Sequence, residues 1–302
     1  MAPAQIVVGV DGSTEAEGAV RWAAERARGT GAPLRLLHAY ALPVPTPGMP
    51  LAAVAPYPVN PDEYARAGEA VLAAAAEVAR GAAAEVPVHT DLRAGGAAPA
   101  LIEASTDAGL VVVGSRGLGG FTGLLLGSVG VQVSIHAHCP TAVIRGDTAA
   151  AGPVVVGVDG SPASHTALDF AFAEAQRLGR SVRAVHAWGA PLPTGPGEAA
   201  ALVRTHHVGR EAPVRAANQL LAEALAPHRR SFPDVEVDEL LTEAGAAPAL
   251  LEAARDAVLV VIGSRGRGGF AGLLLGSTSQ TLVHHAPCPV VVTRPGQSGP
   301  AV

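Results

Sequence analysis

Residues 110–128 read LVVVGSRGLGGFTGLLLGS, and residues 259–277 read LVVIGSRGRGGFAGLLLGS. In each copy an apolar run ends in a glycine-rich turn, and a Gly-Ser pair follows where we expect a helix to begin. A short apolar run bounded by glycine is typical of a strand buried in a parallel sheet. The stretch therefore predicts a strand, a glycine-rich loop and a helix, twice in one chain.

The rest of the chain repeats in the same order. Three further segments of the first half return in the second: IVVGVDGS at 6–13 as VVVGVDGS at 154–161, RAGGAAPALIEAS at 93–105 as TEAGAAPALLEAA at 242–254, and HCPTAVIR at 138–145 as PCPVVVTR at 287–294. Because whole elements keep their order and spacing, the pattern indicates a duplicated domain rather than a short-period solenoid. We predict two domains, 1–146 and 153–295, and 302 residues are enough for both.

Strands and helices are expected to alternate within each half. In the first half the strands are expected at 6–10, 34–40, 86–92, 110–113 and 141–145, and the helices at 13–29, 62–84, 99–107 and 124–136. Such alternation predicts a parallel sheet with helices on both faces. The fold class is therefore α/β, with two tandem doubly wound (Rossmann-like or flavodoxin-like) domains, each a five-stranded sheet of order 3-2-1-4-5. Ligands of such sheets bind beyond the carboxyl ends of the strands, here between strands one and four.

The amino-acid composition excludes several classes of protein. All 21 basic residues are arginine, so a Schiff-base lysine and a Walker A phosphate loop are excluded. The net charge is -5, no arginine cluster forms a basic stripe, and nucleic-acid binding is not expected. Glutamate and arginine interrupt the alanine-rich runs well before 18 residues and the start has no signal-peptide pattern, so we expect no membrane span and a cytoplasmic location. Cys139 and Cys288, each followed by proline, are expected to be buried small residues rather than a disulfide.

The glycine-rich turn carries the chemistry. Gly114-Ser115-Arg116-Gly117, nine residues and Gly127-Ser128 match Gly263-Ser264-Arg265-Gly266, nine residues and Gly276-Ser277. Glycines let backbone N–H groups approach an anion, and the N–H groups that open a helix favour phosphate. The loop follows the fourth strand, so it is not the dinucleotide fingerprint that follows a first strand. A phosphate site is favoured over plain turn geometry because the turn occurs twice with one spacing.

An aspartate follows the first strand of each half. The Asp11 carboxylate, and likewise that of Asp159, can accept hydrogen bonds from ribose hydroxyls or from an adenine amino group. The alternative is that the aspartate only supports the turn before the next helix.

The G-x2-G-x9-G-[S/T] pattern resembles the ATP-binding class of the universal stress protein family, as do the opening VGVDGS and the closing CPV-like strand. The resemblance holds for both halves and so covers nearly the whole chain. It implies that each domain binds ATP, either alone or together with Mg²⁺. It places the phosphates on the glycine-rich loop, the nucleoside beside the first strand, and adenine against the backbone near His38-Ala39 and His186-Ala187. The candidate binding residues are Gly9, Asp11, Ala39, Gly114, Ser115, Arg116, Gly117, Gly120, Gly127 and Ser128 in the first half, and Gly157, Asp159, Ala187, Gly263, Ser264, Arg265, Gly266, Gly269, Gly276 and Ser277 in the second.

Three functions stay open from sequence. The favoured one is a regulatory ATP-binding module in stress response or growth control, at most a weak ATPase. The alternatives are an ATP-using enzyme, such as a nucleotidyl transferase, and a structural dimer that has lost its ligand. The resemblance also suggests that the closing strands of the two halves meet in an internal pseudo-dimer, and that the chain forms a homodimer.

No metal site is expected, because the histidine pairs lack acidic or cysteine neighbours at ligand spacing: His136 and His138, His284 and His285, and His206 and His207.

Two proline-rich loops, 42–61 and 189–197, are long for connections between elements. Loops of that length are often functional. We expect either a lid over the nucleotide or a partner contact, with a mobile surface loop as the equal alternative.

Overall fold

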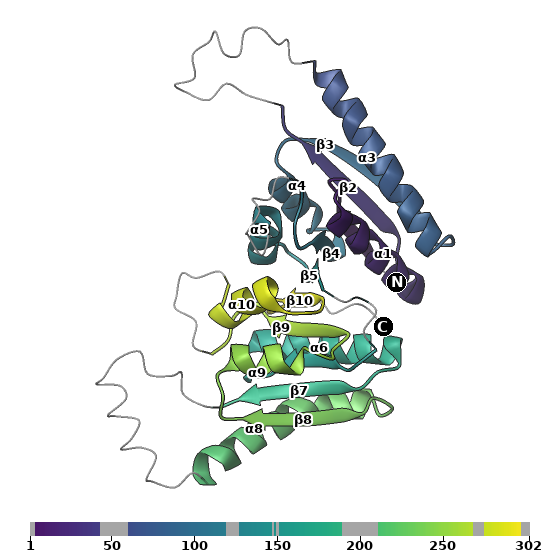
Figure 1. Ribbon diagram of the computed structural model, residues 1–302. Coiled ribbons are helices and arrows are strands. Elements are labelled where there is room, and N and C mark those ends of the chain that lie inside the picture. Colours follow the sequence, from purple (N-terminus) through teal and green to yellow (C-terminus); the bar gives the residue numbers. More distant parts are fainter. Residues whose placement is uncertain are drawn as a thin grey trace, which may run out of the picture. The chain divides into compact units, whose positions relative to one another are not determined.

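The computed structural model describes residues 4–42, 60–118, 127–146, 148, 151–188, 211–267 and 275–296. Its internal contacts divide the chain into two compact units, Met1–His138 and Cys139–Val302. Figure 1 shows strands and helices alternating along each unit. The proline-rich loops at 43–59 and 189–210 lie outside the described residues, and so do Gly120 and Gly269 of the candidate site.

The first unit is a parallel sheet with helices against it. Its elements are β1 (Gln5–Gly9), α1 (Thr14–Thr30), β2 (Leu34–Tyr40), α3 (Pro61–Ala82), β3 (Val88–Ala94), α4 (Ala97–Ala104), β4 (Ala108–Gly114) and α5 (Ser128–His136). The strand order within this unit is β3-β2-β1-β4, and the three pairs are parallel. Valine, leucine and isoleucine on the inner strands are buried on both faces, as a sheet covered by helices requires.

The second unit repeats this arrangement and adds one strand. Its elements are β5 (Thr141–Ile144), β6 (Val154–Gly157), α6 (Pro162–Leu178), β7 (Val182–Ala187), α8 (Glu211–Ser231), β8 (Val237–Thr242), α9 (Ala246–Ala253), β9 (Leu259–Gly263), α10 (Ser277–His285) and β10 (Val290–Thr293). The order is β5-β10-β9-β6-β7-β8. Only the β5–β10 pair is antiparallel among the pairs described in this unit.

The α/β doubly wound fold predicted from sequence is confirmed. The second repeat shows the order 3-2-1-4-5, and the first unit contains the first four strands of its repeat in the order 3-2-1-4. The fifth strand of the first repeat, β5, lies in the second compact unit, where Val143 pairs with Val290 and Ala142 with Val291. The expectation that the two closing strands meet is confirmed by this pairing. Each strand thereby satisfies an edge whose N–H and C=O groups would otherwise be unpaired.

The first helix of each repeat has a side-chain cap. The Ser13 hydroxyl accepts a hydrogen bond from the Ala16 N–H at 3.2 Å, and the Ser161 hydroxyl accepts one from the Ser164 N–H at 3.2 Å. Both helices end at a glycine in the left-handed conformation, Gly31 and Gly179, which closes a helix without Cβ strain. Both helices therefore begin at a serine cap.

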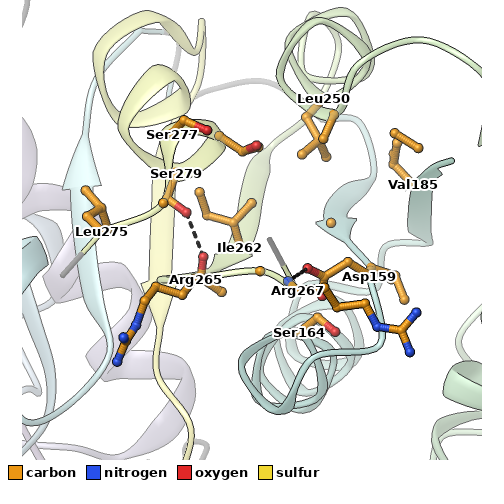
Figure 2. A pocket seen from close by; sticks show the side chains of 18 residues that line it. Asp159, Ser164, Val185, Leu250, Ile262, Arg265, Arg267, Leu275, Ser277 and Ser279 are labelled. Atoms are coloured by element: carbon orange, nitrogen blue, oxygen red, sulfur yellow. Dashed lines mark hydrogen bonds between the residues drawn. The ribbon is translucent and has the colours of Figure 1, made fainter. Parts of the chain in front are cut away.

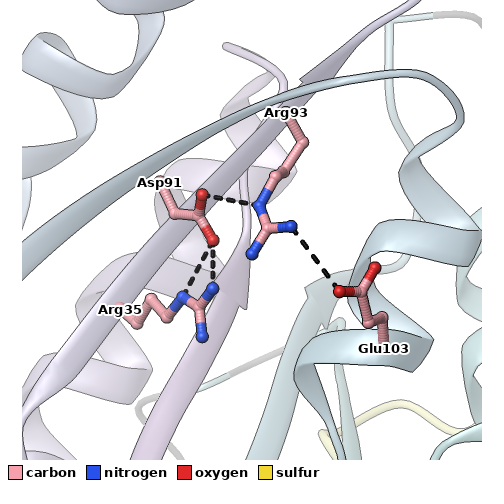
Figure 3. Close-up of polar contacts among 4 residues, drawn as sticks. All are labelled: Arg35, Asp91, Arg93 and Glu103. Carbon is pink, nitrogen blue, oxygen red and sulfur yellow. Dashed lines mark hydrogen bonds and ion pairs between the residues drawn. The ribbon is translucent and has the colours of Figure 1, made fainter.

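An ion-pair network joins the outer strands of the first unit (Figure 3). Asp91 of β3 accepts hydrogen bonds from Arg35 of β2 and, at 2.8 Å, from Nε of Arg93, whose Nη1 lies 3.7 Å from Oε1 of Glu103 on α4. Partial burial would raise the pKa of Asp91, but the hydrogen bonds and charges of the two arginines outweigh it and hold the pKa below its ordinary value. The network fixes β3, an edge strand of this unit, to its neighbours.

The two cysteines lie in the protein interior and are not joined in a disulfide. Cys139 and Cys288 are both buried, and burial raises the pKa of Cys288 to about 12. Because the thiolate is the reactive form, we expect iodoacetamide at pH 8 to leave both residues unmodified in the folded protein and to modify both in denaturant. Intact mass before and after treatment measures this, and modification of either cysteine in the folded chain would contradict it.

Candidate functional site

An aspartate connects two turns in each unit. Oδ1 of Asp11 accepts hydrogen bonds from the Ser13 N–H at 3.0 Å and the Ser13 hydroxyl at 2.6 Å, and its Oδ2 accepts one from the Leu118 N–H at 2.9 Å. Asp159 repeats the arrangement with the N–H groups of Ser161, at 2.9 Å, and Arg267, at 3.0 Å. The carboxylate thus holds the turn after the first strand of the repeat against the loop after the fourth.

Glycine is required beside each of these carboxylates. A Cβ added at Gly117 would lie 2.2 Å from Oδ2 of Asp11, and one at Gly266 would lie 2.3 Å from Oδ2 of Asp159. Both contacts are far below the distances that real Cβ atoms adopt, so the loop can approach the aspartate only with glycine at these positions. Gly114 and Gly263 are equally constrained, because a Cβ there would lie within 3 Å of the backbone of α1 and α6 respectively.

The Asp159 carboxylate is held in its ionised form. Burial acts to raise its pKa, but hydrogen bonds from Ser161, from the Arg267 N–H and from Ser164 outweigh burial and hold the pKa below its usual value. A negative charge therefore stays at the carboxyl end of β6 at neutral pH.

The glycine-rich loop closes where the following helix begins. The Gly127 N–H donates to the Ser115 carbonyl at 2.8 Å, and the Gly276 N–H donates to the Ser264 carbonyl at 2.7 Å. Helices α5 and α10 then start at Ser128 and Ser277 without a side-chain cap and without an acidic residue in the first turn. Their first N–H groups are thus free of the side-chain partners that cap α1 and α6.

A cavity of about 490 Å³ lies at this place in the second unit (Figure 2). It is bounded by the carboxyl ends of β6, β7 and β9 and by the start of α10. Its apolar lining includes Val185, Leu250 and Ile262, and the opposite side carries charged and hydroxyl groups: Asp159, Ser164, Arg265, Arg267, Ser277, Thr278 and Ser279. The cavity therefore combines an apolar wall with a polar loop and a helix start.

Most sequence candidates of the second repeat line this cavity: Gly157, Asp159, Ala187, Gly263, Arg265, Gly266, Gly276 and Ser277. Ser264 does not, because its side chain is buried beneath the loop. In the first repeat, Gly9, Asp11, Ala39, Gly114, Ser115, Arg116, Gly117, Gly127 and Ser128 occupy the same places on β1, β2, β4 and α5. Gly120 and Gly269 lie outside the described residues.

Several lining residues were not found from sequence, among them Ser164, Leu250, Ile262, Arg267 and Ser279. Ser279 donates a hydrogen bond from its hydroxyl to the Gly263 carbonyl at 2.7 Å and so joins α10 to the end of β9. Leu250 belongs to the repeated AAPALLEA segment on α9, whose recurrence was the only sequence signal for it.

A histidine at the end of the second strand anchors each site. Nδ1 of His38 lies 2.7 Å from the Val10 carbonyl, and Nδ1 of His186 lies 2.7 Å from the Val158 carbonyl. The ring thereby ties the end of β2 to β1, or of β7 to β6, and fixes the backbone at Ala39 or Ala187. The imidazole has this structural task in both units.

Two further features of the described residues bear on other functions. No three histidine, cysteine, aspartate or glutamate side chains gather there into a group that could hold a metal ion. No helix in the described part of the chain is long and apolar enough to cross a membrane. His284 and His285 face each other with ring centroids 6.2 Å apart; burial, together with the charges of His285 and Arg145, lowers the pKa of His284.

Comparison with known proteins agrees with this architecture. The family model described as "Universal stress protein family" matches residues 4–145 and 151–294. A universal stress protein of Mycolicibacterium smegmatis is 40% identical over 300 residues, covering 96% of this chain and 97% of its own. Among solved structures, a universal stress protein of Archaeoglobus fulgidus covers 97% of both chains with a TM-score of 0.68 and 20% identity, which shows a shared fold. Another from that organism, solved in complex with dAMP, covers 48% of this chain and all of its own, with 25% identity and a TM-score of 0.36. With both repeats matched, the chain belongs to the universal stress protein family and carries the family's domain twice.

Proposed function

We propose that each repeat, 1–146 and 153–295, binds one adenine nucleotide, ATP first of all, and that the chain works as a regulatory nucleotide-binding module. The observation that carries the proposal is the second-unit cavity, where an apolar wall faces the uncapped start of α10. Its volume of about 490 Å³ falls within the range of ordinary small-molecule sites.

The phosphate tail is assigned to the loop and the helix start. The first N–H groups of α10 lack a capping side chain, and helix N-termini favour anions. A Cβ at Gly276 would meet its nearest atom at 3.5 Å, and one at Gly127 at 3.7 Å, which are ordinary contacts. Packing within the protein therefore does not explain these two glycines, whereas a phosphate close to the backbone would.

The nucleoside is assigned to the apolar wall. Val185, Leu250 and Ile262 offer a surface for a base, and Ala187 lines the same cavity. The Asp159 carboxylate lines the same cavity and is an acceptor, for which ribose hydroxyls are suitable donors. The bracing role of the aspartate and a ligand role are thus compatible. Any Mg²⁺ would be held by the phosphates and water, since Mg²⁺ is commonly bound in that way.

Regulation is favoured over catalysis. Asp159, the carboxylate that lines the cavity among the described residues, is engaged by two backbone N–H groups and has a lowered pKa, which makes it a poor general base. We further propose, on the family resemblance, a cytoplasmic homodimer that binds neither nucleic acid nor membrane.

Native mass spectrometry and titration calorimetry of the purified chain test the proposal. We expect two adenine nucleotides per chain, either copurified or bound on addition of ATP. Sustained release of ADP or AMP at ordinary enzymatic rates, about 1 per second or faster, would instead favour an ATP-using enzyme. Absence of both bound nucleotide and ATP affinity would favour a structural protein that has lost its ligand.

A further inference from the structure

The two glycine-rich loops differ in charge at one position of their described part. The first reads SRGLGG and the second SRGRGG, so Leu118 stands where the second repeat has Arg267. The two residues are structurally equivalent, because the N–H of each donates to Oδ2 of the repeat's aspartate. Leu118 is 74% exposed, whereas Arg267 lines the cavity, and its guanidinium lies near Gly160 in the turn after β6.

The first turn of the neighbouring helix differs as well. Nη2 of Arg116 lies 2.9 Å from Oε1 of Glu15 on α1. Glu15 packs against Gly114, and the residue that packs in the same way against Gly263 is Ala163. Among the described residues, no carboxylate lies within ion-pair distance of Arg265 or Arg267.

Both differences, Leu118 against Arg267 and Glu15 against Ala163, make the second loop more positive than the first. In the first loop Arg116 is neutralised by Glu15 and Leu118 is uncharged, so the pair of positions has no net charge. In the second loop Arg265 and Arg267 both keep their charges, and Figure 2 shows them on the loop that bounds the cavity opposite Leu250. In the described part of the chain, the second loop therefore has two arginines without a carboxylate partner, whereas the first has one arginine and it is paired.

A third arginine adds to this imbalance. Burial lowers the pKa of Arg294, and the charge of Arg265 lowers it further, so the two guanidinium groups feel each other's charge. An anion bound beside Arg265 relieves that repulsion. The first loop has no such need, because Glu15 already supplies the counter-charge to Arg116.

We infer that the two nucleotide sites are unequal: the second repeat is the site for a triphosphate tail, and the first discriminates less between nucleotides with three phosphates and with one. This rests on the proposed function. Each added phosphate brings negative charge towards Arg265 and Arg267, whereas in the described part of the first loop the one arginine, Arg116, is already paired with Glu15. For partly exposed charges at moderate salt we expect an ATP-over-AMP preference about three- to tenfold larger at the second site.

The test measures each site alone in the full-length chain. Gly117→Val is expected to block the first site, so that binding at the second can be measured. Gly266→Val is expected to block the second site, so that binding at the first can be measured. ATP and AMP are titrated by calorimetry into each background at low and high salt. Adding Arg267→Leu, which copies the first repeat, should remove most of the second site's extra preference for ATP, and adding Leu118→Arg together with Glu15→Ala should raise that of the first. Arg255→Leu, an exposed arginine of the second unit paired with Glu252, is the matched control and should change neither.

The outcomes separate the two proposals. Equal ATP-over-AMP ratios at both sites, or no effect of Arg267→Leu, would overturn the inequality and leave nucleotide binding intact. If the unmutated chain binds no adenine nucleotide, both proposals fail. Should a glycine variant not fold, photo-cross-linking of the unmutated chain with azido-ATP at limiting concentration, followed by peptide mapping, decides instead. Label mainly on the second unit supports the inference, and equal label on both units overturns it.

Discussion

A Gly117→Val, Gly266→Val double variant should fold and yet bind adenine nucleotide about ten- to hundredfold more weakly at both sites. At each position a side chain would occupy the place of an aspartate oxygen, 2.2 Å away in the first unit and 2.3 Å in the second. The carboxylate must then move, and its hydrogen bond to the loop N–H is lost. The loop that leads to the start of α5 or α10 therefore loses the position in which we propose that it meets phosphate.

The fold should survive because the conflict is with a side chain. Among the described residues, the atoms within 4 Å of the added Cβ belong to Asp11 or Asp159, and neither glycine has a positive φ. A double variant of Gly18 and Gly81 to valine is the matched control, since a Cβ at either would meet nothing within 4 Å. Circular dichroism checks folding and calorimetry measures affinity. Full ATP affinity in a folded Gly117, Gly266 variant would refute the phosphate-loop assignment for both repeats.

Much of the fold could be predicted from local pattern because parallel strands buried on both faces have nearly continuous apolar runs. The second strand, Leu34–Tyr40, was predicted to the residue. Helix α1 was predicted from Ser13, and the structure begins it one residue later, with Ser13 as the cap. The third strand was expected at 86–92 and is found at Val88–Ala94, because its mixed polar and apolar residues, on an exposed edge, give no sharp boundary.

What the sequence does not contain is the destination of the fifth strand. Residues 141–144 form a strand as expected, but an apolar run does not specify its neighbour. The structure pairs β5 with β10 and places it by its contacts in the second unit. That choice depends on the two exposed edges being complementary, which is a property of the folded units and not of the segment.

In the candidate site, too, some residues could be predicted from local sequence and others only from tertiary packing. The repeated glycines and aspartates were visible because chemistry that needs backbone approach leaves glycine at fixed spacing. The partners of those residues were not visible, since Glu15 meets Arg116, and Leu250 meets the cavity, only through tertiary packing. The sequence does contain a signal for Arg267, because this residue is the one charged difference between two otherwise matching SRG-x-GG segments.

Asp159→Asn should destabilise the second unit by about 1–3 kcal/mol at pH 7, although the substitution conserves shape. Both carboxylate oxygens accept from backbone N–H groups, Oδ1 from Ser161 and Oδ2 from Arg267. An asparagine offers one oxygen and one NH₂ group, so one of the two N–H groups must face another donor. Nucleotide affinity at the second site should fall with it, because the loop is no longer fixed.

The stability that Asp159 contributes to the second unit should decrease as the pH falls. The folded pKa of Asp159 is lowered, whereas an unfolded aspartate titrates near about 3.9. The unfolded state therefore takes up the proton first, and the stability that the carboxylate contributes is complete above that value and is lost as the pH falls through the folded pKa. Below it the protonated aspartic acid resembles asparagine, so the difference between the unmutated chain and the variant should shrink.

Hydrogen exchange of the β6 and β9 amides, read by mass spectrometry at neutral and at acidic pH, reports the second unit separately from the first. Asp256→Asn is the matched control, because Asp256 is largely exposed, pairs with Arg183 at 2.9 Å and should change stability by about 0.5 kcal/mol or less. A variant of Asp159 as stable as the unmutated chain at pH 7 would mean that the aspartate does not brace the two turns. The lowered pKa and the requirement for glycine at position 266 would then need another cause, because both follow from one carboxylate held between two N–H groups.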